Sequence, residues 1–201
     1  MKDKELRSFA LNEFRVDSAE GMPPRMFGHA AMFNSLSGDL GGFREQIAPG
    51  AFRKSLESAD VRALFNHDSN IVLGRNKAGT LRLKEDESGL AIEIDPPDTQ
   101  AARDLMVSMK RGDINQMSFG FRTITDKWEK RDGEWLRTLR EVELFDVSPV
   151  TYPAYASTDI AIRSMNDAIK LEIPDTRYML DLIKRKRSEE RRVGKECLRL
   201  C

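Results

Sequence analysis

Hydrophobic and polar residues alternate along two neighbouring segments, 80–84 and 90–95. A period of two is typical of strands that bury one face. The residues between them, 85–89, are polar and end in Gly89, which favours a tight reversal of the chain. The pattern therefore predicts a β-hairpin.

Several other segments combine apolar alternation with polar boundaries and also predict strands. Residues 126–134 are strongly charged and include Gly133, so they are predicted to connect a strand over 117–125 with a strand over 136–147. The predicted strands cover residues 7–16, interrupted near Asn12, and residues 28–33, 61–65, 117–125 and 136–147.

A helical pattern follows Pro96 and Pro97. Asp98 or Thr99 can cap a helix that runs to about Arg111, and Gly112 then ends it. Its apolar face would be formed by Ala102, Leu105, Met106 and Met109. A short helix is also predicted within 51–58. Strands dominate without regular βαβ alternation, which favours a mixed α+β barrel or sandwich.

The composition bounds the organisation and the partners of the chain. With 201 residues, of which 40% are hydrophobic, we expect one domain over 1–165 and a helical or flexible tail over 166–201. Lysine plus arginine and aspartate plus glutamate number 33 each, so the formal charge is zero and neither nucleic acid nor an anionic membrane is an expected partner. The chain begins without the apolar core of a signal peptide, and no apolar stretch approaches the roughly 18 residues of a membrane span.

Metal and disulfide chemistry are not expected. Cys197 and Cys201 lie at the far end of the chain, and His29 and His67 are distant in sequence with no cysteine or histidine cluster near either. We therefore predict no metal and no cofactor. Residues 187–197 resemble the translation of a DNA-sequencing adapter, so we expect the natural protein to end differently.

His67 and Ser118 are the candidate reactive residues. His67 lies in a polar turn that follows a strand, and a histidine can act as the base that a weakly nucleophilic serine needs. Strand alternation places Ser118 and Gly120 on one face, where the glycine would leave room for a substrate, and Phe119 and Phe121 on the other. Taken singly, each residue also fits an ordinary turn or an exposed strand face.

A third group would orient the imidazole of His67. The predicted strand over 136–147 offers Glu141, Glu143 and Asp146. Strand alternation places Glu141 and Glu143 on one face and Asp146 on the other, so at most one face can supply this group.

The order of several short motifs between residues 9 and 163 resembles the prohead serine protease family of tailed phages, which is similar to the herpesvirus assemblins. This resemblance implies a mostly antiparallel closed β-barrel wrapped by a few helices. The motifs are Pro49-Gly50-Ala51-Phe52, Asn66-His67-Asp68, Leu73-Gly74-Arg75, Gly79-Thr80-Leu81, Met117-Ser118-Phe119-Gly120-Phe121 and Val-Ser-Pro-Val-Thr-Tyr-Pro-Ala over 147–154.

The resemblance also implies roles for single residues. Ser118 matches the nucleophile and His67 the general base. Glu141 lies at the position of the third assemblin residue, a histidine, and Asp146 is the alternative because an acidic residue before Val-Ser-Pro-Val is typical of the phage family. Where assemblins carry paired arginines for the oxyanion, this chain has Ser148 and Pro149, so backbone N–H groups or another donor would have to serve.

The implied function is a serine endopeptidase of phage head maturation. Its substrates would be the major capsid protein, the scaffold region and its own chain, inside the procapsid in the host cytoplasm. The analogy with assemblins adds a homodimer to these expectations. Two alternatives stay open: a non-catalytic assembly protein that binds capsid or scaffold chains, and a hydrolase of small esters. The second is disfavoured because no Gly-x-Ser-x-Gly elbow surrounds Ser118.

Overall fold

The computed structural model describes residues 4–10, 15–17, 23–152 and 159–172. The chain divides into two compact units, Met1–Ile160 and Ala161–Cys201. Most of the second unit, including both cysteines and most of the predicted tail, lies outside the described residues, and the assignment of 1–165 to one domain stays a prediction. No helix of the described segments is long and apolar enough to cross a bilayer.

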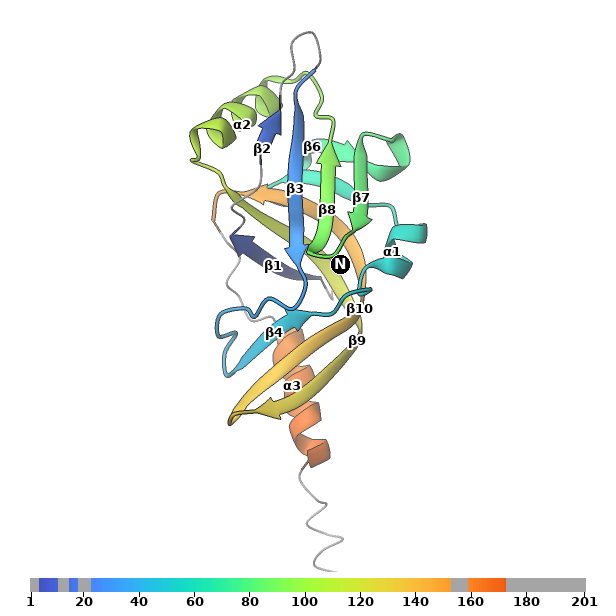
Figure 1. The fold of residues 1–201 in the computed structure, drawn as a ribbon, viewed down its shortest axis with the longest axis vertical. Helices are drawn as coiled ribbons and strands as arrows, with labels where there is room; N and C mark the ends of the chain where they lie inside the picture. The colour runs from blue at the N-terminus through green and yellow to red at the C-terminus, as the bar shows by residue number, and fades with distance from the viewer. Residues whose placement is uncertain (1–3, 11–14, 18–22, 153–158, 173–201) are drawn as a thin grey trace, which may run out of the picture. The chain divides into compact units, whose positions relative to one another are not determined.

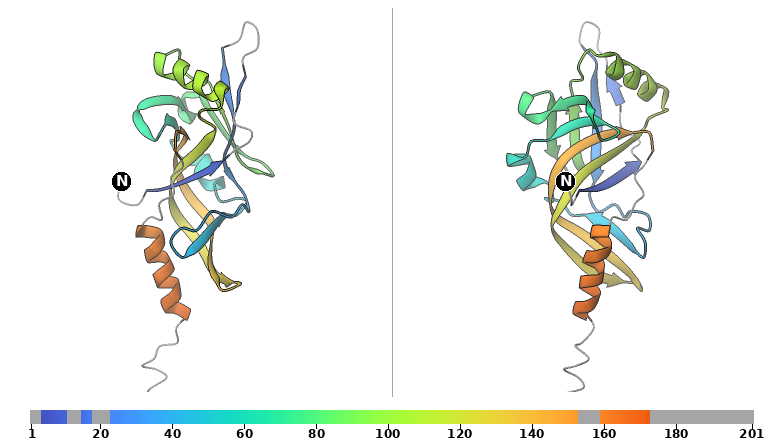
Figure 2. Two further views of the ribbon diagram at one scale, coloured as in Figure 1. Left: turned by 90° about the vertical axis from the view of Figure 1, so that its left-hand side faces the viewer. Right: turned by 180° about the vertical axis from the view of Figure 1, so that it is seen from behind.

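One sheet of the first unit has six strands and is built around a long antiparallel pair (Figure 1). The pair is β9 (Gln116–Arg131) and β10 (Glu134–Val150). β1 (Glu5–Ala10) extends the sheet beside β9, and β5 (Arg62–Phe65) and β6 (Asp68–Arg75) extend it beyond β10. β4 (Phe43–Ile47) also runs parallel to β10, further toward its start. Figure 2, seen from behind, shows β1 lying beside the β9–β10 pair.

A second sheet has four antiparallel strands in the order β2-β3-β8-β7. They are β2 (Arg15–Asp17), β3 (Arg25–Met32), β8 (Gly89–Ile94) and β7 (Leu81–Glu85), and the last three lie side by side in Figure 1. The pairing of β7 with β8 confirms the hairpin that was predicted from the alternation of apolar residues.

The helices are α1 (Arg53–Ser58), α2 (Gln100–Arg111) and α3 (Asp159–Glu172), with a 3-10 turn, η1, at Asn76–Ala78. α2 follows its prediction closely. The Thr99 hydroxyl accepts a hydrogen bond from the Ala102 N–H at its start, Gly112 caps its end, and the four predicted apolar residues are buried.

The hydrophobic core joins the two sheets, with β3 packed against β9. Phe52, just before α1, contacts Phe33 and Phe119, with ring centroids 6.3 and 5.6 Å apart. Phe119 in turn stacks on Phe121 at 4.8 Å. Because Phe119 flanks Ser118, this packing holds the central part of β9 rigidly in place.

Two sequence-based expectations need correction. The mixed α+β fold, rich in strands with few helices, is confirmed, but neither sheet of the described strands closes on itself, since β1 and β6 each pair on one side. A closed barrel is therefore not confirmed. The charged segment 126–134 is also mostly strand, because β9 continues to Arg131 and the reversal uses Asp132 and Gly133 alone. Within this segment the ring of Trp128 packs on Phe43.

A buried network of charges fixes β1 and β4 to the β9–β10 pair. The Arg137 guanidinium, 1% exposed, contacts Glu5 at 2.8 Å, Glu45 at 2.9 Å and Asp126 at 2.7 Å. Arg7 reaches the same two glutamates at 3.0 and 2.7 Å. Burial opposes ionisation of Glu5, but the Arg137 guanidinium beside it holds the pKa of that carboxyl below its usual range. Such charges are tolerated in a core because they are paired and hydrogen-bonded.

Candidate active site

His67 lies in a two-residue hairpin turn between β5 and β6. Phe65 pairs with Asp68, and the two turn residues, Asn66 and His67, have φ of 53° and 59°. Such left-handed values at both positions are typical of a type I′ turn. Thr151 fixes the turn from the end of β10: its N–H donates to Asn66 Oδ1 at 2.9 Å, and its hydroxyl accepts from Asn66 Nδ2 at 3.1 Å. The imidazole therefore projects from a well-supported turn.

Ser118 lies on β9 and is completely buried, although a solvent-facing serine was one interpretation of its strand. The core residues Met117 and Phe119 flank it on the opposite face, as alternation predicted. Its Oγ lies 2.7 Å from His67 Nε2. At this distance the imidazole can accept the hydroxyl proton.

Asp146 occupies the other side of the His67 ring. Its Oδ1 is hydrogen-bonded to His67 Nδ1 and accepts a second bond from the Ser148 hydroxyl at 3.1 Å. Its Oδ2 lies 2.5 Å from Lys4 Nζ. A carboxylate only accepts, so Nδ1 carries the proton and Nε2 is free to act as a base. Burial opposes ionisation of Asp146, but His67 and Lys4 outweigh it and lower the pKa of the carboxyl.

A β-bulge places Asp146 on the same face as Ser118. Along β10, Glu143 pairs with Arg122, but Asp146 pairs with Gly120 and Ser148 with Ser118, because the register shifts between Leu144 and Asp146. Cross-strand neighbours share a face, so the extra residue inverts the alternation. The expectation that Asp146 and Glu143 face opposite sides was therefore wrong, since it assumed an uninterrupted strand.

Glu141, the first choice for the third residue, is not brought to His67. Its carboxylate pairs with Lys54 Nζ of α1 at 2.7 Å, while both ring nitrogens of His67 are occupied by Ser118 and Asp146. The structure thus brings together His67, Ser118 and the alternative third residue, Asp146.

Sequence reasoning missed two further residues of this cluster, Ser148 and Lys4. Ser148 pairs directly with Ser118, but counting from the β9–β10 turn would place it opposite Met117, because the register of β10 shifts along the strand. No signal in the sequence links Lys4 to a carboxylate so far along the chain.

Gly120 has a different role from the one expected of it. A Cβ added there would lie 2.3 Å from Lys4 Cε and 2.5 Å from Asp146 Oδ2. The space over the glycine is therefore filled by the Lys4–Asp146 pair and gives no room for a substrate.

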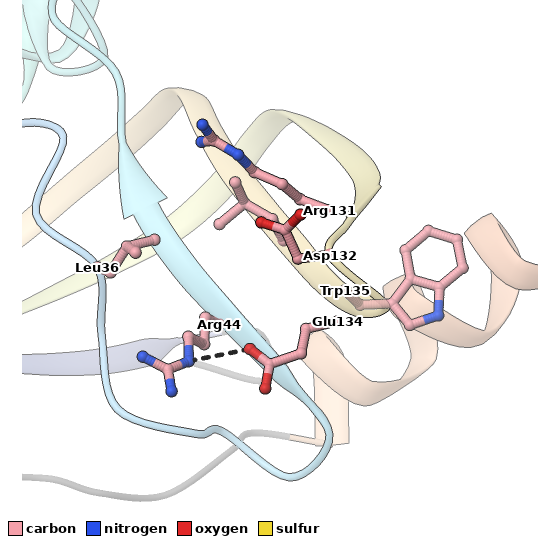
Figure 3. A pocket seen from close by; sticks show the side chains of 7 residues that line it. Leu36, Arg44, Arg131, Asp132, Glu134 and Trp135 are labelled. Carbon is pink, nitrogen blue, oxygen red and sulfur yellow. Dashed lines mark ion pairs between the residues drawn. The ribbon is translucent and has the colours of Figure 1, made fainter.

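Other features of the described residues add no chemistry to this cluster. No group of three or more potential metal ligands occurs among them, and His29 is hydrogen-bonded to Asp86 at 2.8 Å. A cavity of about 340 Å³ lies at the β9–β10 turn (Figure 3), where Arg44 and Glu134 are 3.3 Å apart. It is lined by neither the serine nor the histidine of the cluster.

Comparison with known proteins shows the family of this chain. The family model for caudovirus prohead serine proteases matches residues 12–171. The chain belongs to this family. It is 30% identical over 166 residues to the prohead protease of Enterobacteria phage HK97, an alignment that covers 79% of this chain and 67% of that protein. No solved structure matches. Membership in the caudovirus family supports a protease of the phage prohead, with serine catalysis implied by the family's name.

The backbone of His67 gives a prediction about stability. Left-handed φ favours glycine, so we expect His67→Gly to unfold with a free energy about 1 kcal/mol higher than His67→Ala, since both lose the same side-chain contacts. Urea unfolding of the two variants measures this difference. His29 lies in strand β3 without left-handed φ, and there the alanine variant should be the more stable. The same ranking at both sites would contradict the expected turn strain.

Proposed function

We propose that this chain is the serine endopeptidase that cuts capsid and scaffold polypeptides, and its own chain, during phage head assembly. In this proposal Ser118 is the nucleophile, His67 the general base and Asp146 the group that orients the imidazole. The observation that carries it is the continuous contact from Ser118 Oγ through the His67 ring, at 2.7 Å from Nε2, to Asp146 on Nδ1. The family's name supports the same chemistry.

The proposed reaction has two halves. Ser118 Oγ attacks the carbonyl carbon of a peptide bond while His67 Nε2 accepts its proton, and that proton then passes to the departing amine. His67 next removes a proton from water as that water attacks the ester. His67 then returns this proton to Ser118 Oγ as the acid product leaves. Asp146 stays ionised throughout and stabilises the imidazolium, a role that fits its lowered pKa.

The oxyanion of each tetrahedral intermediate needs donors. Ser148 stands where the assemblins carry paired arginines, but its hydroxyl donates to Asp146 Oδ1 at 3.1 Å. We therefore propose that backbone N–H groups stabilise the oxyanion in this chain.

The proposed substrates and compartment are supported by the family of the chain. The relative from phage HK97 is named a prohead protease, and we infer that this chain likewise acts on the major capsid protein and its scaffold region inside the procapsid in the host cell. A homodimer belongs to the same proposal by analogy with assemblins. The non-catalytic alternative would be favoured if His67 and Ser118 lay too far apart to hydrogen-bond, and their 2.7 Å contact counts against it.

A chemical label and a natural substrate together test the proposal. Treatment of the folded chain with a fluorophosphonate should add one phosphonyl group, located by peptide mass spectrometry on Ser118, and denatured chain should stay unlabelled. Co-expression with the major capsid protein of the same phage should yield discrete truncated capsid chains by intact-mass analysis. An unlabelled Ser118 together with full-length capsid protein would favour the assembly-protein alternative.

A further inference from the structure

Lys4 contacts the candidate active site from the position just before β1, a strand that carries none of the three central residues of the site. Its Nζ lies 2.5 Å from Asp146 Oδ2, and the side chains are 25% and 4% exposed. The same lysine lies against Gly120, where an added Cβ would fall 2.3 Å from Lys4 Cε. A lysine this closely packed against a buried carboxylate differs from a solvated surface pair.

We propose that Lys4 is a positioning residue of this site, which fixes the rotation of the Asp146 carboxylate and offsets its negative charge beside His67. This inference rests on the proposed serine protease function. It assigns Lys4 an effect on how readily His67 accepts a proton, exerted through Asp146 and without contact between Lys4 and the substrate.

The contacts of Asp146 divide between its two oxygens. Oδ1 is hydrogen-bonded to His67 and Ser148, whereas Oδ2 forms the ion pair with Lys4. An ammonium group donates and cannot accept, so it holds Oδ2 on its own side and leaves Oδ1 directed at the imidazole. Of these three partners, only those of Oδ1 would remain without Lys4. The rotation of the carboxylate would then be less restricted.

The backbone next to Lys4 is anchored independently. Glu5 is fully buried and is held by Arg137 at 2.8 Å and Arg7 at 3.0 Å. Leu6 pairs with Gly120 across the β1–β9 ladder. The start of β1 therefore presents Lys4 to Asp146 from a fixed position, as a positioning role requires.

The charges around His67 give this role a pH signature. Among the described residues, the charged groups that contact the ring or its partner are Asp146 of β10 and Lys4 just before β1. The next charges on this face, Arg122 of β9 and Glu143 of β10, pair with each other at 2.5 Å. In the turn itself, Asp68 accepts from the Asn70 N–H at 2.9 Å. Removing the Lys4 charge should therefore leave Asp146 unopposed and favour protonation of His67.

The pH profile of cleavage tests this inference with three variants. In Lys4→Met, the acid limb of kcat/KM should move to higher pH by about one unit, which is about a tenfold loss on that limb, with little change in KM. Lys4→Arg should restore most of the parent profile. Lys54→Met is the matched control, because Lys54 also pairs with a β10 carboxylate, Glu141 at 2.7 Å, away from His67. Coincident profiles for Lys4→Met and Lys54→Met would overturn the proposal.

An NMR titration separates this inference from the proposed function. The chain has two histidines, so the imidazole signals can be assigned with a His29→Gln variant. In a Ser118→Ala background, Lys4→Met should raise the pH at which the His67 signals titrate. A raised midpoint, together with a parent chain that cleaves nothing, would support Lys4 and contradict the protease, whereas cleavage by the parent chain with unmoved signals and profiles would contradict Lys4 alone.

Discussion

Replacing Ser118 by alanine is expected to lower kcat/KM by about 10⁵- to 10⁶-fold while the fold persists. The proposed mechanism leaves no other nucleophile in contact with His67 Nε2, so the acyl-enzyme cannot form. The substitution removes one buried oxygen and its hydrogen bond to His67, which should change the free energy of unfolding by only about 1 kcal/mol. Loss of activity would then reflect chemistry and not unfolding.

Cleavage of the capsid protein, followed by intact mass, and urea unfolding measure the two quantities separately. Ser108→Ala is a suitable control, because the Ser108 hydroxyl donates to Asp104 O on the exposed side of α2 and takes no part in the cluster. This variant should cleave at the parent rate. If Ser118→Ala retained more than a few per cent of the activity, Ser118 would not be the nucleophile.

Ser118 and His67 could be proposed as nucleophile and base because the motifs around them resemble those of the prohead protease family. Asn66 and His67 form a turn that the polar sequence predicted, and alternation placed Phe119 in the core and Ser118 on the opposite face. Neither pattern could show that the two residues meet. Their proximity depends on β5 pairing with β10 and on the register between β9 and β10, and the local patterns around His67 and Ser118 predict neither.

The third residue was harder to predict because β10 is irregular, with register shifts between Glu141 and Val142 and between Leu144 and Asp146. Counting along β10 assumes regular alternation, and the extra residue between Leu144 and Asp146 breaks that assumption. The resemblance to assemblins led to Glu141 as first choice, whereas in the structure the Glu141 side chain pairs with Lys54. Lys4 was beyond prediction for a related reason, since its contact with Asp146 depends on the placement of the edge strand β1.

The elements themselves were predicted best where local signals agree. For α2, the cap at Thr99, the spacing of apolar residues and Gly112 all indicate the same helix. The prediction of a connecting loop over 126–134 was wrong because charge was taken as evidence for a loop. Strand residues that face solvent can be charged as well. In this segment the strand also carries Trp128, whose ring packs on Phe43.

Asp146→Asn is expected to lower kcat/KM by about ten-thousandfold, the size of effect seen when the orienting carboxylate of a serine triad becomes an amide. The contact with Lys4 determines which way the amide group of the asparagine would turn. An ammonium group donates only, so the asparagine oxygen would turn toward Lys4 and its NH₂ group toward His67 Nδ1. His67 would then carry its proton on Nε2 and could not accept one from Ser118.

Glu141→Gln provides the comparison that decides between the two candidate carboxylates. Glu141 pairs at 2.7 Å with Lys54, which is 73% exposed, and surface pairs of this kind contribute little. We therefore expect its kcat/KM to stay within about twofold of the parent value, measured on the same capsid substrate. The opposite ranking, with Glu141→Gln inactive and Asp146→Asn active, would restore Glu141 as the third residue. A double variant, Lys4→Met with Asp146→Asn, tests the cause: once the ammonium group is gone the amide can turn its oxygen to Nδ1, so part of the lost activity should return.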